Sequence, residues 1–140
     1  MAGVRVQQKI GVKPDMRCIL VGASPEQASA LGFQSDELPH RLSGSFDYIH
    51  LFVTVGAQAA IAFPRMKRHL RAGGMLWVSW PKGGKLNTDL SLRKIIAIGY
   101  SHGLVESKTL SVDATWSAMK FTYPKKDKAY NNSYGQLPPP

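Results

Sequence analysis

The sequence predicts an α/β protein: a three-layer, mostly parallel, doubly wound sheet of about six strands. Three observations predict it. Apolar runs that suit buried strands alternate with stretches of helical spacing along the chain. One of these runs, Met75 to Trp80, is apolar on both alternating faces, as a strand covered by helices on both sides must be. The last two strands follow each other without a helix, so an antiparallel strand is expected near the C-terminal edge.

The chain has 140 residues, is 44% hydrophobic and fits one compact domain. We expect this domain to span residues 1–123. The basic, proline-rich stretch 124–140 is expected to form a flexible tail, because it cannot bury enough apolar surface to order itself. The apolar runs are far shorter than the roughly 18 residues that span a bilayer, and the N-terminus lacks a hydrophobic signal core. We therefore expect a cytoplasmic protein without membrane contact.

Charge and cysteine content narrow the function further. Eighteen basic and nine acidic residues give a formal net charge of +9, which attracts polyanions at low salt. Cys18 is the only cysteine and lies in an apolar run. We therefore expect a buried structural thiol rather than a nucleophile, and no internal disulfide.

The first strand is expected at Met16 to Gly22, followed by a helix that begins after Ser24. The Ser24 side chain suits a helix cap because its oxygen accepts from free backbone N–H groups. Pro25 suits the first helical position, and Glu26 suits the positive end of the helix dipole. This helix should end at Gly32, where glycine commonly ends a helix.

Signals are weak between residues 33 and 45, where we expect at most a short strand near His40 to Leu42. Phe46 to Thr54 is a central strand, and an Ala-rich helix follows Gly56. The buried stripe of that helix has helical spacing and consists of Ala59, Phe63, Met66 and Leu70. Pro64 interrupts the pattern and predicts a kink or a break, because an interior proline costs about 3 kcal/mol in a regular helix.

Gly73 and Gly74 are expected to end that helix and to lead into the buried strand Met75 to Trp80. After a loop at residues 81–87, Thr88 and Asp89 open a helix that ends at Gly103. Its buried face should hold Leu92, Ile95, Ile96 and Gly99. Two strands, at residues 104–112 and 116–123, close the sheet.

This element order predicts the strand order second, first, third, fourth, sixth, fifth. In such a sheet, ligands lie outside the carboxyl ends of the strands, near the point where the winding reverses. The candidate ligand-binding residues at that edge are Gly22, Ser24, Thr54, Trp80, Lys82, Asp113, Thr115, Trp116 and Ser117.

Each candidate also has a structural interpretation. Trp80 can stack on a planar ligand or cover the sheet edge, and Lys82 can neutralise an anion or remain solvated. Asp113 and its neighbours bring a carboxylate, two hydroxyls and an aromatic face into one turn, which Asp and Thr also favour for purely local reasons. His50 lies mid-strand, where a neutral imidazole bonded to a neighbour is the ordinary outcome.

Several site types have no support in the sequence. Gly83, Gly84 and Lys85 fail the phosphate-loop pattern, because Ser79 replaces its first glycine and Leu86 replaces the metal-binding hydroxyl. We find no Ser-His-Asp order, no paired-carboxylate spacing and no His/Cys metal cluster. We therefore assign neither catalytic residues nor a metal.

A basic run offers a second kind of site. Its candidates for binding a polyanion such as a nucleic acid lie on the Ala-rich helix, mostly off the buried stripe, and are Arg65, Lys67, Arg68 and Arg71. Such a run is also typical of a solvated helix face, and the chain carries no nucleic-acid motif. The oligomeric state is left open.

Three segments resemble the class I S-adenosylmethionine-dependent methyltransferases. They are Lys13 to Arg17 before the first strand, Phe46 to Ile49, and Leu70 to Leu76. The resemblance covers most of residues 13–123 and implies a Rossmann-like fold with S-adenosylmethionine as the cofactor to consider. It departs from the pattern after the first strand, where residues 21–25 hold one glycine and no leading acid, and where no acid clearly follows the second strand.

A second resemblance is closer but carries no activity. Tyr48 to Phe52, Leu76 to Lys82 and Val112 to Ser117 resemble a family of short bacterial proteins catalogued only as a domain of unknown function. Our leading hypothesis is a methyltransferase-like domain that is not catalytic and binds a small ligand or partner at the carboxyl-edge crevice. A methyltransferase with an atypical cofactor turn is the alternative, and a polyanion-binding protein is the second alternative.

Overall fold

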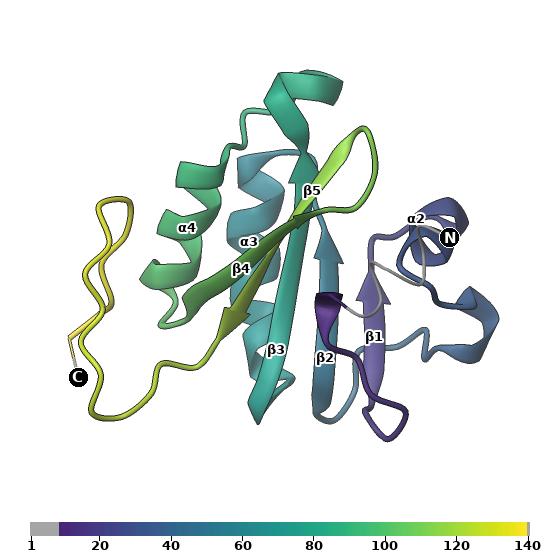
Figure 1. The fold of residues 1–140 in the computed structure, drawn as a ribbon, viewed down its shortest axis with the longest axis horizontal. Helices are drawn as coiled ribbons and strands as arrows, with labels where there is room; N and C mark the ends of the chain where they lie inside the picture. Colours follow the sequence, from purple (N-terminus) through teal and green to yellow (C-terminus); the bar gives the residue numbers. More distant parts are fainter. Residues whose placement is uncertain (1–8, 140) are drawn as a thin grey trace.

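The structure is a computed structural model that describes residues 9–139, and it contains one five-stranded sheet (Figure 1). The strands lie in the order β1-β2-β3-β5-β4. Their bounds are Cys18–Val21 for β1, Phe46–Phe52 for β2, Leu70–Pro81 for β3, Val105–Ser111 for β4 and Trp116–Thr122 for β5. β1, β2 and β3 run parallel, whereas β5 is antiparallel to both β3 and β4. The sheet is therefore mixed rather than mostly parallel.

This is the predicted strand order, except that the strand predicted to come second along the chain is not formed. The segment expected to form that strand, His40 to Leu42, has no regular structure, and a short 3-10 helix, η1, spans Ser35–Glu37 instead. Pro39 precedes the segment and has no N–H group to donate to a neighbouring strand. β1 is therefore an outer strand of the sheet.

Two apolar layers cover the two faces of the sheet. Helices α3 (Gly56–Arg68) and α4 (Leu92–Ser101) lie together on one face, where Phe63, Ile95 and Phe121 belong to the larger core cluster (Figure 1). The other face is covered by the short α2 (Pro25–Ala30) and by the chain around Ile10. The second layer is thinner, because α2 has only six residues.

The Gly73–Gly74 pair lies inside β3, so the prediction that it ends the preceding helix is wrong. Helix α3 ends at Arg68, and β3 begins at Leu70. The pairing of β3 with β2 jumps between Leu70 and Met75, which marks a bulge. A Cβ atom at Gly74 would lie 2.8 Å from the carbonyl oxygen of Arg71. Glycine is required there by a close backbone approach.

The two long helices can be compared with the prediction at Pro64 and at the start of α4. α3 continues from Gly56 to Arg68 with Pro64 inside it, so no break occurs there, and the predicted kink stays a prediction. α4 begins at Leu92 and is capped by Ser91, whose side chain accepts the Lys94 N–H, rather than opening at Thr88 and Asp89. Leu92 is 43% exposed and does not belong to the buried face.

The C-terminal tail lies beside α4 and the start of β4 (Figure 1). Tyr130 and Leu137 pack against the larger core cluster, and the Asn132 amide donates to the Glu106 carboxylate at 2.8 Å. These contacts place the tail on the domain, and its predicted mobility stays a prediction. Within residues 9–139, no helix has the length and apolar character needed to cross a membrane.

We predict that Gly99→Ala destabilises the domain by about 1–3 kcal/mol, the usual cost of overpacking. A Cβ atom at this position would lie 2.0 Å from a ring carbon of Phe121. Alanine's better helix propensity is worth only about 1 kcal/mol, so the clash should win. Urea denaturation measures the change. The control is Lys94→Ala on the exposed side of the same helix, and equal stability of both variants would contradict this packing.

Candidate functional site

The carboxyl ends of β1, β2 and β3 meet at one edge of the sheet, where the β4–β5 turn also arrives. Pro81 at the end of β3 pairs with Trp116 at the start of β5. The lysine that follows, Lys82, donates its backbone N–H to the Thr115 carbonyl at 2.7 Å. The strand ends thereby bring the candidate residues from Gly22 to Ser117 to the same edge.

The turn after β1 forces two backbones together. Gly22 has φ +78°, and a Cβ atom there would lie 2.7 Å from the carbonyl oxygen of Phe52 in β2. Ser24 caps α2 by accepting the Gln27 N–H at 3.1 Å, and its own N–H donates to the Gln27 side chain at 2.8 Å. This capping box satisfies two backbone donors that a ligand would otherwise meet.

The N-terminus of α3 already holds a carboxylate. The Asp89 side chain accepts the Gly56 N–H at 2.7 Å, and this backbone hydrogen bond is the main reason that its pKa is lowered. Asp89 had been expected to open its own helix, so its position here was missed. Thr54 precedes helix α3 and donates its backbone N–H to the side-chain oxygen of Gln58 at 3.0 Å. An anionic ligand group would compete with Asp89 at this helix end.

The residues at the end of β3 hold the neighbouring turn. Trp80 is 4% exposed and belongs to the core cluster under α3 and α4, which leaves little of its ring for a ligand. The Lys82 ammonium donates to the Ser111 hydroxyl at 2.5 Å, and the Lys85 ammonium donates to the Ala114 carbonyl at 2.6 Å. Both lysines therefore tie the β4–β5 turn to the end of β3.

Asp113 has the local role that its residue type favours. One carboxylate oxygen accepts the backbone N–H groups of Thr115 and Trp116, each at 2.8 Å. The Trp116 ring is buried and packs edge-on against Phe52, with ring centroids 5.4 Å apart. The Asp113 carboxylate is therefore used to hold its own turn, as the structural interpretation predicts. The half-buried Thr115 and Ser117 hydroxyls remain available to a ligand.

A small cavity lies next to this edge, beside the β1–α2 turn. Its volume is about 160 Å³, and it is lined by Leu20, Ala23, Ala28, Leu38, Pro39 and His40. A groove of about 320 Å³ shares Leu38 and Pro39 and continues past Arg17 and Cys18. Both hollows lie along the outer side of β1, where the predicted second strand is missing.

A buried hydrogen-bond chain joins β2 to β3 in the sheet interior. The Tyr48 hydroxyl lies 2.5 Å from Nδ1 of His50, and Nε2 of His50 lies 2.6 Å from the Ser79 hydroxyl. All three residues are fully buried. Burial lowers the pKa of His50 to about 3 and raises the pKa of Tyr48 well above its ordinary value. The arrangement is a neutral structural network without access for a substrate.

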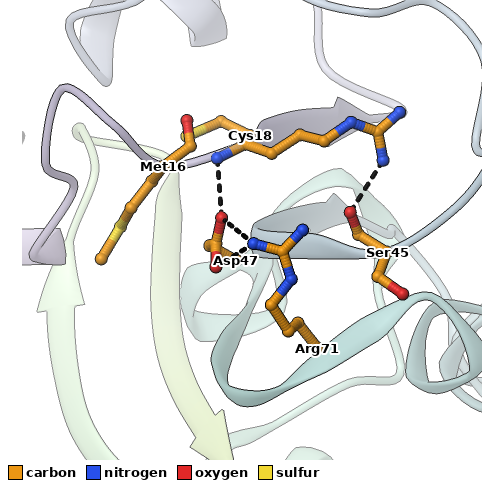
Figure 2. Close-up of polar contacts among 6 residues, drawn as sticks. Met16, Cys18, Ser45, Asp47 and Arg71 are labelled. Atoms are coloured by element: carbon orange, nitrogen blue, oxygen red, sulfur yellow. Dashed lines mark hydrogen bonds and ion pairs between the residues drawn. The ribbon is translucent and has the colours of Figure 1, made fainter.

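An ionic cluster holds the opposite, amino edge of the sheet. Asp47 lies between the β1 backbone and the Arg71 guanidinium, accepting the Arg17 N–H at 2.8 Å and Arg71 at 2.8 Å (Figure 2). The Arg17 guanidinium donates to the Ser45 carbonyl at 2.7 Å (Figure 2). Arg71 therefore lies in β3 and is ion-paired, and the prediction that it sits on the basic helix is wrong.

Of the other polyanion candidates, one is bonded within the fold and two are exposed. Lys67 donates to the His102 carbonyl at 2.5 Å, which uses its ammonium within the fold. Arg65 and Arg68 are exposed on the last turn of α3. The exposed basic group of this helix is thus smaller than the sequence run indicated.

Cys18 is a buried free thiol, as predicted. Burial, with a smaller effect of Asp47, raises the pKa of its thiol to about 11, so it is protonated at neutral pH and a poor nucleophile. Within residues 9–139 no group of three or more His, Cys, Asp or Glu side chains is placed to hold a metal ion.

Comparison with known proteins identifies the fold. No family model matches the sequence, and neither does any curated protein. A crystal structure of ribosomal protein L11 methylase from Lactobacillus delbrueckii subsp. bulgaricus is similar with a TM-score of 0.57 and 16% identity, covering 89% of this chain and 78% of that one. A structure of LepI in complex with SAM has a TM-score of 0.51 and 14% identity, covering 88% of this chain and 40% of that one.

These likenesses show the fold alone: a Rossmann-like domain similar to methyltransferases. The distant resemblance in the sequence is thereby confirmed at the level of fold. The closer resemblance to the short bacterial family stays a prediction.

We predict that the domain loses stability as the pH falls from 6.5 toward 3. Folded His50 stays neutral with a pKa of about 3, whereas unfolded His50 binds a proton below its ordinary value of 6.5. The unfolded state then holds more protons, so the free energy of unfolding should fall by at most about 1.4 kcal/mol per pH unit from this residue. Urea denaturation at a series of pH values measures the slope.

His50→Gln should remove about one proton from that slope, because it removes the buried imidazole. The matched control is His40→Gln, which makes the same replacement at an exposed position. A His50→Gln slope equal to that of the unmodified protein would refute the buried neutral histidine.

Proposed function

We propose that this domain binds a small molecule at the carboxyl end of β1, and that the molecule is S-adenosylmethionine or its demethylated product. The observation that carries the proposal is the cavity beside the Gly22 turn, lined by Ala23 and His40 among others. The fold supports the choice of ligand, because one similar structure is a methylase and another is in complex with SAM. In open α/β sheets, the carboxyl ends of the strands are the usual place for such a ligand.

The size of the cavity sets a condition on binding. About 160 Å³ is less than the roughly 300 Å³ at the lower limit of ligand pockets. Leu38 and Pro39 line both this cavity and the 320 Å³ groove, and their segment makes no strand pairing with β1. Displacement of that segment would join the two hollows and make room for a nucleoside-sized ligand.

Recognition of the ligand must differ from that of the methyltransferases that the sequence resembles. Within residues 9–139 no second strand with an acid at its end lies beside β1, and Asp36 and Glu37 lie exposed in η1. Asp89 also occupies the start of α3. Binding would therefore rest mainly on apolar contact with Leu20 and Leu38, because the capping box already uses the backbone N–H groups of Ser24 and Gln27.

The proposal leaves two functions to separate. A binding domain that has lost catalysis releases S-adenosylmethionine unchanged. A methyltransferase converts it to the demethylated product in the presence of an acceptor, and the likeness to a methylase favours this second candidate. Methyl transfer needs the donor and acceptor to be held in line at close distance, more than it needs an ionisable catalytic side chain.

We predict that S-adenosylmethionine and its demethylated product bind the unmodified protein in a calorimetric titration. Ala23→Leu should weaken that binding about tenfold or more, because the added methyl groups fill the cavity that Ala23 lines. The matched control is Ala60→Leu, which adds the same groups at an exposed position of α3. Lack of binding by the unmodified protein would overturn the proposal, and so would equal binding by the two variants.

Polyanion binding is the second alternative, and the net charge of +9 with exposed Arg65 and Arg68 supports it. Its affinity for a duplex oligonucleotide should fall steeply with salt, because binding releases counterions from phosphates. Arg65→Gln with Arg68→Gln should flatten the slope of log affinity against log salt by about 2. The double variant Arg93→Gln, Lys94→Gln on α4 is the control. A titration without binding at low salt would exclude this function.

A further inference from the structure

A larger cavity lies at the opposite edge of the sheet from the cavity beside β1. Its volume is about 500 Å³, and it lies where β3 and β4 begin, β5 ends and the tail departs (Figure 1). Ligand pockets in proteins have volumes of roughly 300–1,000 Å³, so this cavity is large enough for a small molecule. The two cavities share no lining residue, so a ligand here is independent of the proposed function.

Two tyrosines form walls of this cavity, and hydrogen bonds hold both of them. The Tyr123 hydroxyl donates to the Lys67 and Leu70 carbonyls at 3.3 and 3.0 Å. The Tyr130 hydroxyl accepts the backbone N–H of Lys125 at 2.9 Å, and the Tyr130 ring packs against the larger core cluster. Because both rings are already held in place, their ordering should cost little free energy when a ligand binds.

A tight turn at the start of the tail brings two lysines to the cavity. The Lys128 N–H donates to the carbonyls of Lys126 at 2.6 Å and Lys125 at 3.4 Å, so Lys125 and Lys128 lie at the two ends of one turn. These two residues line the cavity, whereas Lys126 and Asp127 at the tip of the turn do not. The Lys128 ammonium lies 5.1 Å from the centroid of the Tyr130 ring, which is one wall. Within residues 9–139, neither cavity lysine forms an ion pair.

The acidic residue beside the cavity, Glu106, has its carboxylate enclosed in the protein. One of its oxygens accepts the Asn132 amide at 2.8 Å, the other is buried, and the Tyr100 side chain lies against the carboxylate. This group is therefore no contact for a ligand, and its charge acts on the cavity only through the wall. Two ammonium groups and one enclosed carboxylate leave an excess of one positive charge, which favours a monoanion.

We propose that this cavity binds a small aromatic carboxylate. The carboxylate group would accept hydrogen bonds from the ammonium groups of Lys125 and Lys128, because charge-assisted hydrogen bonds are stronger than neutral ones. The ring would lie against Tyr123, Tyr130 and the buried Val105, which supply the apolar walls.

Other classes of ligand fit these residues less well. A phosphate monoester brings a second negative charge that the site does not balance. Acetate leaves the two tyrosine walls without contact, and an organic cation meets two ammonium groups. A divalent metal ion has no set of ligands, because within residues 9–139 no three metal-binding side chains lie together.

The test compares phenylacetate with two probes of similar size, the neutral phenylacetamide and the cationic phenethylamine. Backbone NMR shifts of Gly73 and Gly74, which line the cavity, report binding at this site, and their titration gives the affinity. We expect phenylacetate to bind about tenfold more tightly than phenylacetamide, because each exposed ion pair adds only modestly to affinity. Added salt should narrow this difference, since it screens exposed charges.

Three outcomes of these titrations would overturn the proposal. They are equal affinity for phenylacetate and phenylacetamide, tighter binding of phenethylamine, and no shift of Gly73 and Gly74 at millimolar phenylacetate. Phenyl phosphate and acetate test the single charge and the ring, and each should bind more weakly than phenylacetate. Tighter binding of phenyl phosphate, or equal binding of acetate, would refute the choice of an aromatic carboxylate.

Variants test whether the two cavity lysines hold the carboxylate. Lys125→Met and Lys128→Met should each weaken phenylacetate binding about threefold and leave phenylacetamide binding nearly unchanged, because methionine keeps an apolar stem and removes the charge. Lys126→Met is the matched control, since Lys126 is exposed at the tip of the same turn and outside the cavity. Equal effects of all three variants would contradict the site. The probe comparison on the unmodified protein decides the matter if a variant fails to fold.

Discussion

The burial of β2 between β1 and β3 is the constraint on which the rest of this structure depends. Every residue of the strand except Asp47 is buried, and pairing on both sides satisfies its backbone. The one imidazole inside it, His50, is held neutral between the Tyr48 and Ser79 hydroxyls. The two ends of β2 then define the two edges of the molecule, with Asp47 at one and the carbonyl of Phe52 under Gly22 at the other.

At both edges of the sheet, polar side chains bond within the protein. At the carboxyl edge, Lys82, Lys85, Asp89 and Asp113 all bond to the protein itself, so open space remains mainly beside β1. At the amino edge, Asp47 and Arg71 pair with each other, and the Asn132 amide of the tail donates to the Glu106 carboxylate. The missing strand beside β1 and the tail folded beside β4 are therefore the two places where this chain departs from a plain Rossmann-like sheet.

Much of the fold could be predicted, because hydrophobic period and turn residues act locally. The Ser24 cap, the buried β2 run and the final strand pair appear where their patterns placed them. Two errors share a cause. Gly73 and Gly74 suit a helix end as well as a bulge, and Asp89 suits the start of either α3 or its own helix, so only a neighbour distant in sequence decides between them. Local preference cannot rank alternatives that are locally equal.

The sequence by itself determined the α/β class, the strand order around β2 and the edge where strand ends gather, because these follow from periodicity and right-handed crossovers. Tertiary structure decided which of those side chains remain available. Trp80 is buried in the core, Asp113 accepts hydrogen bonds within its own turn, and Arg71 forms an ion pair with Asp47. Hydrogen bonds and ion pairs depend on distances between residues that only the folded chain brings together.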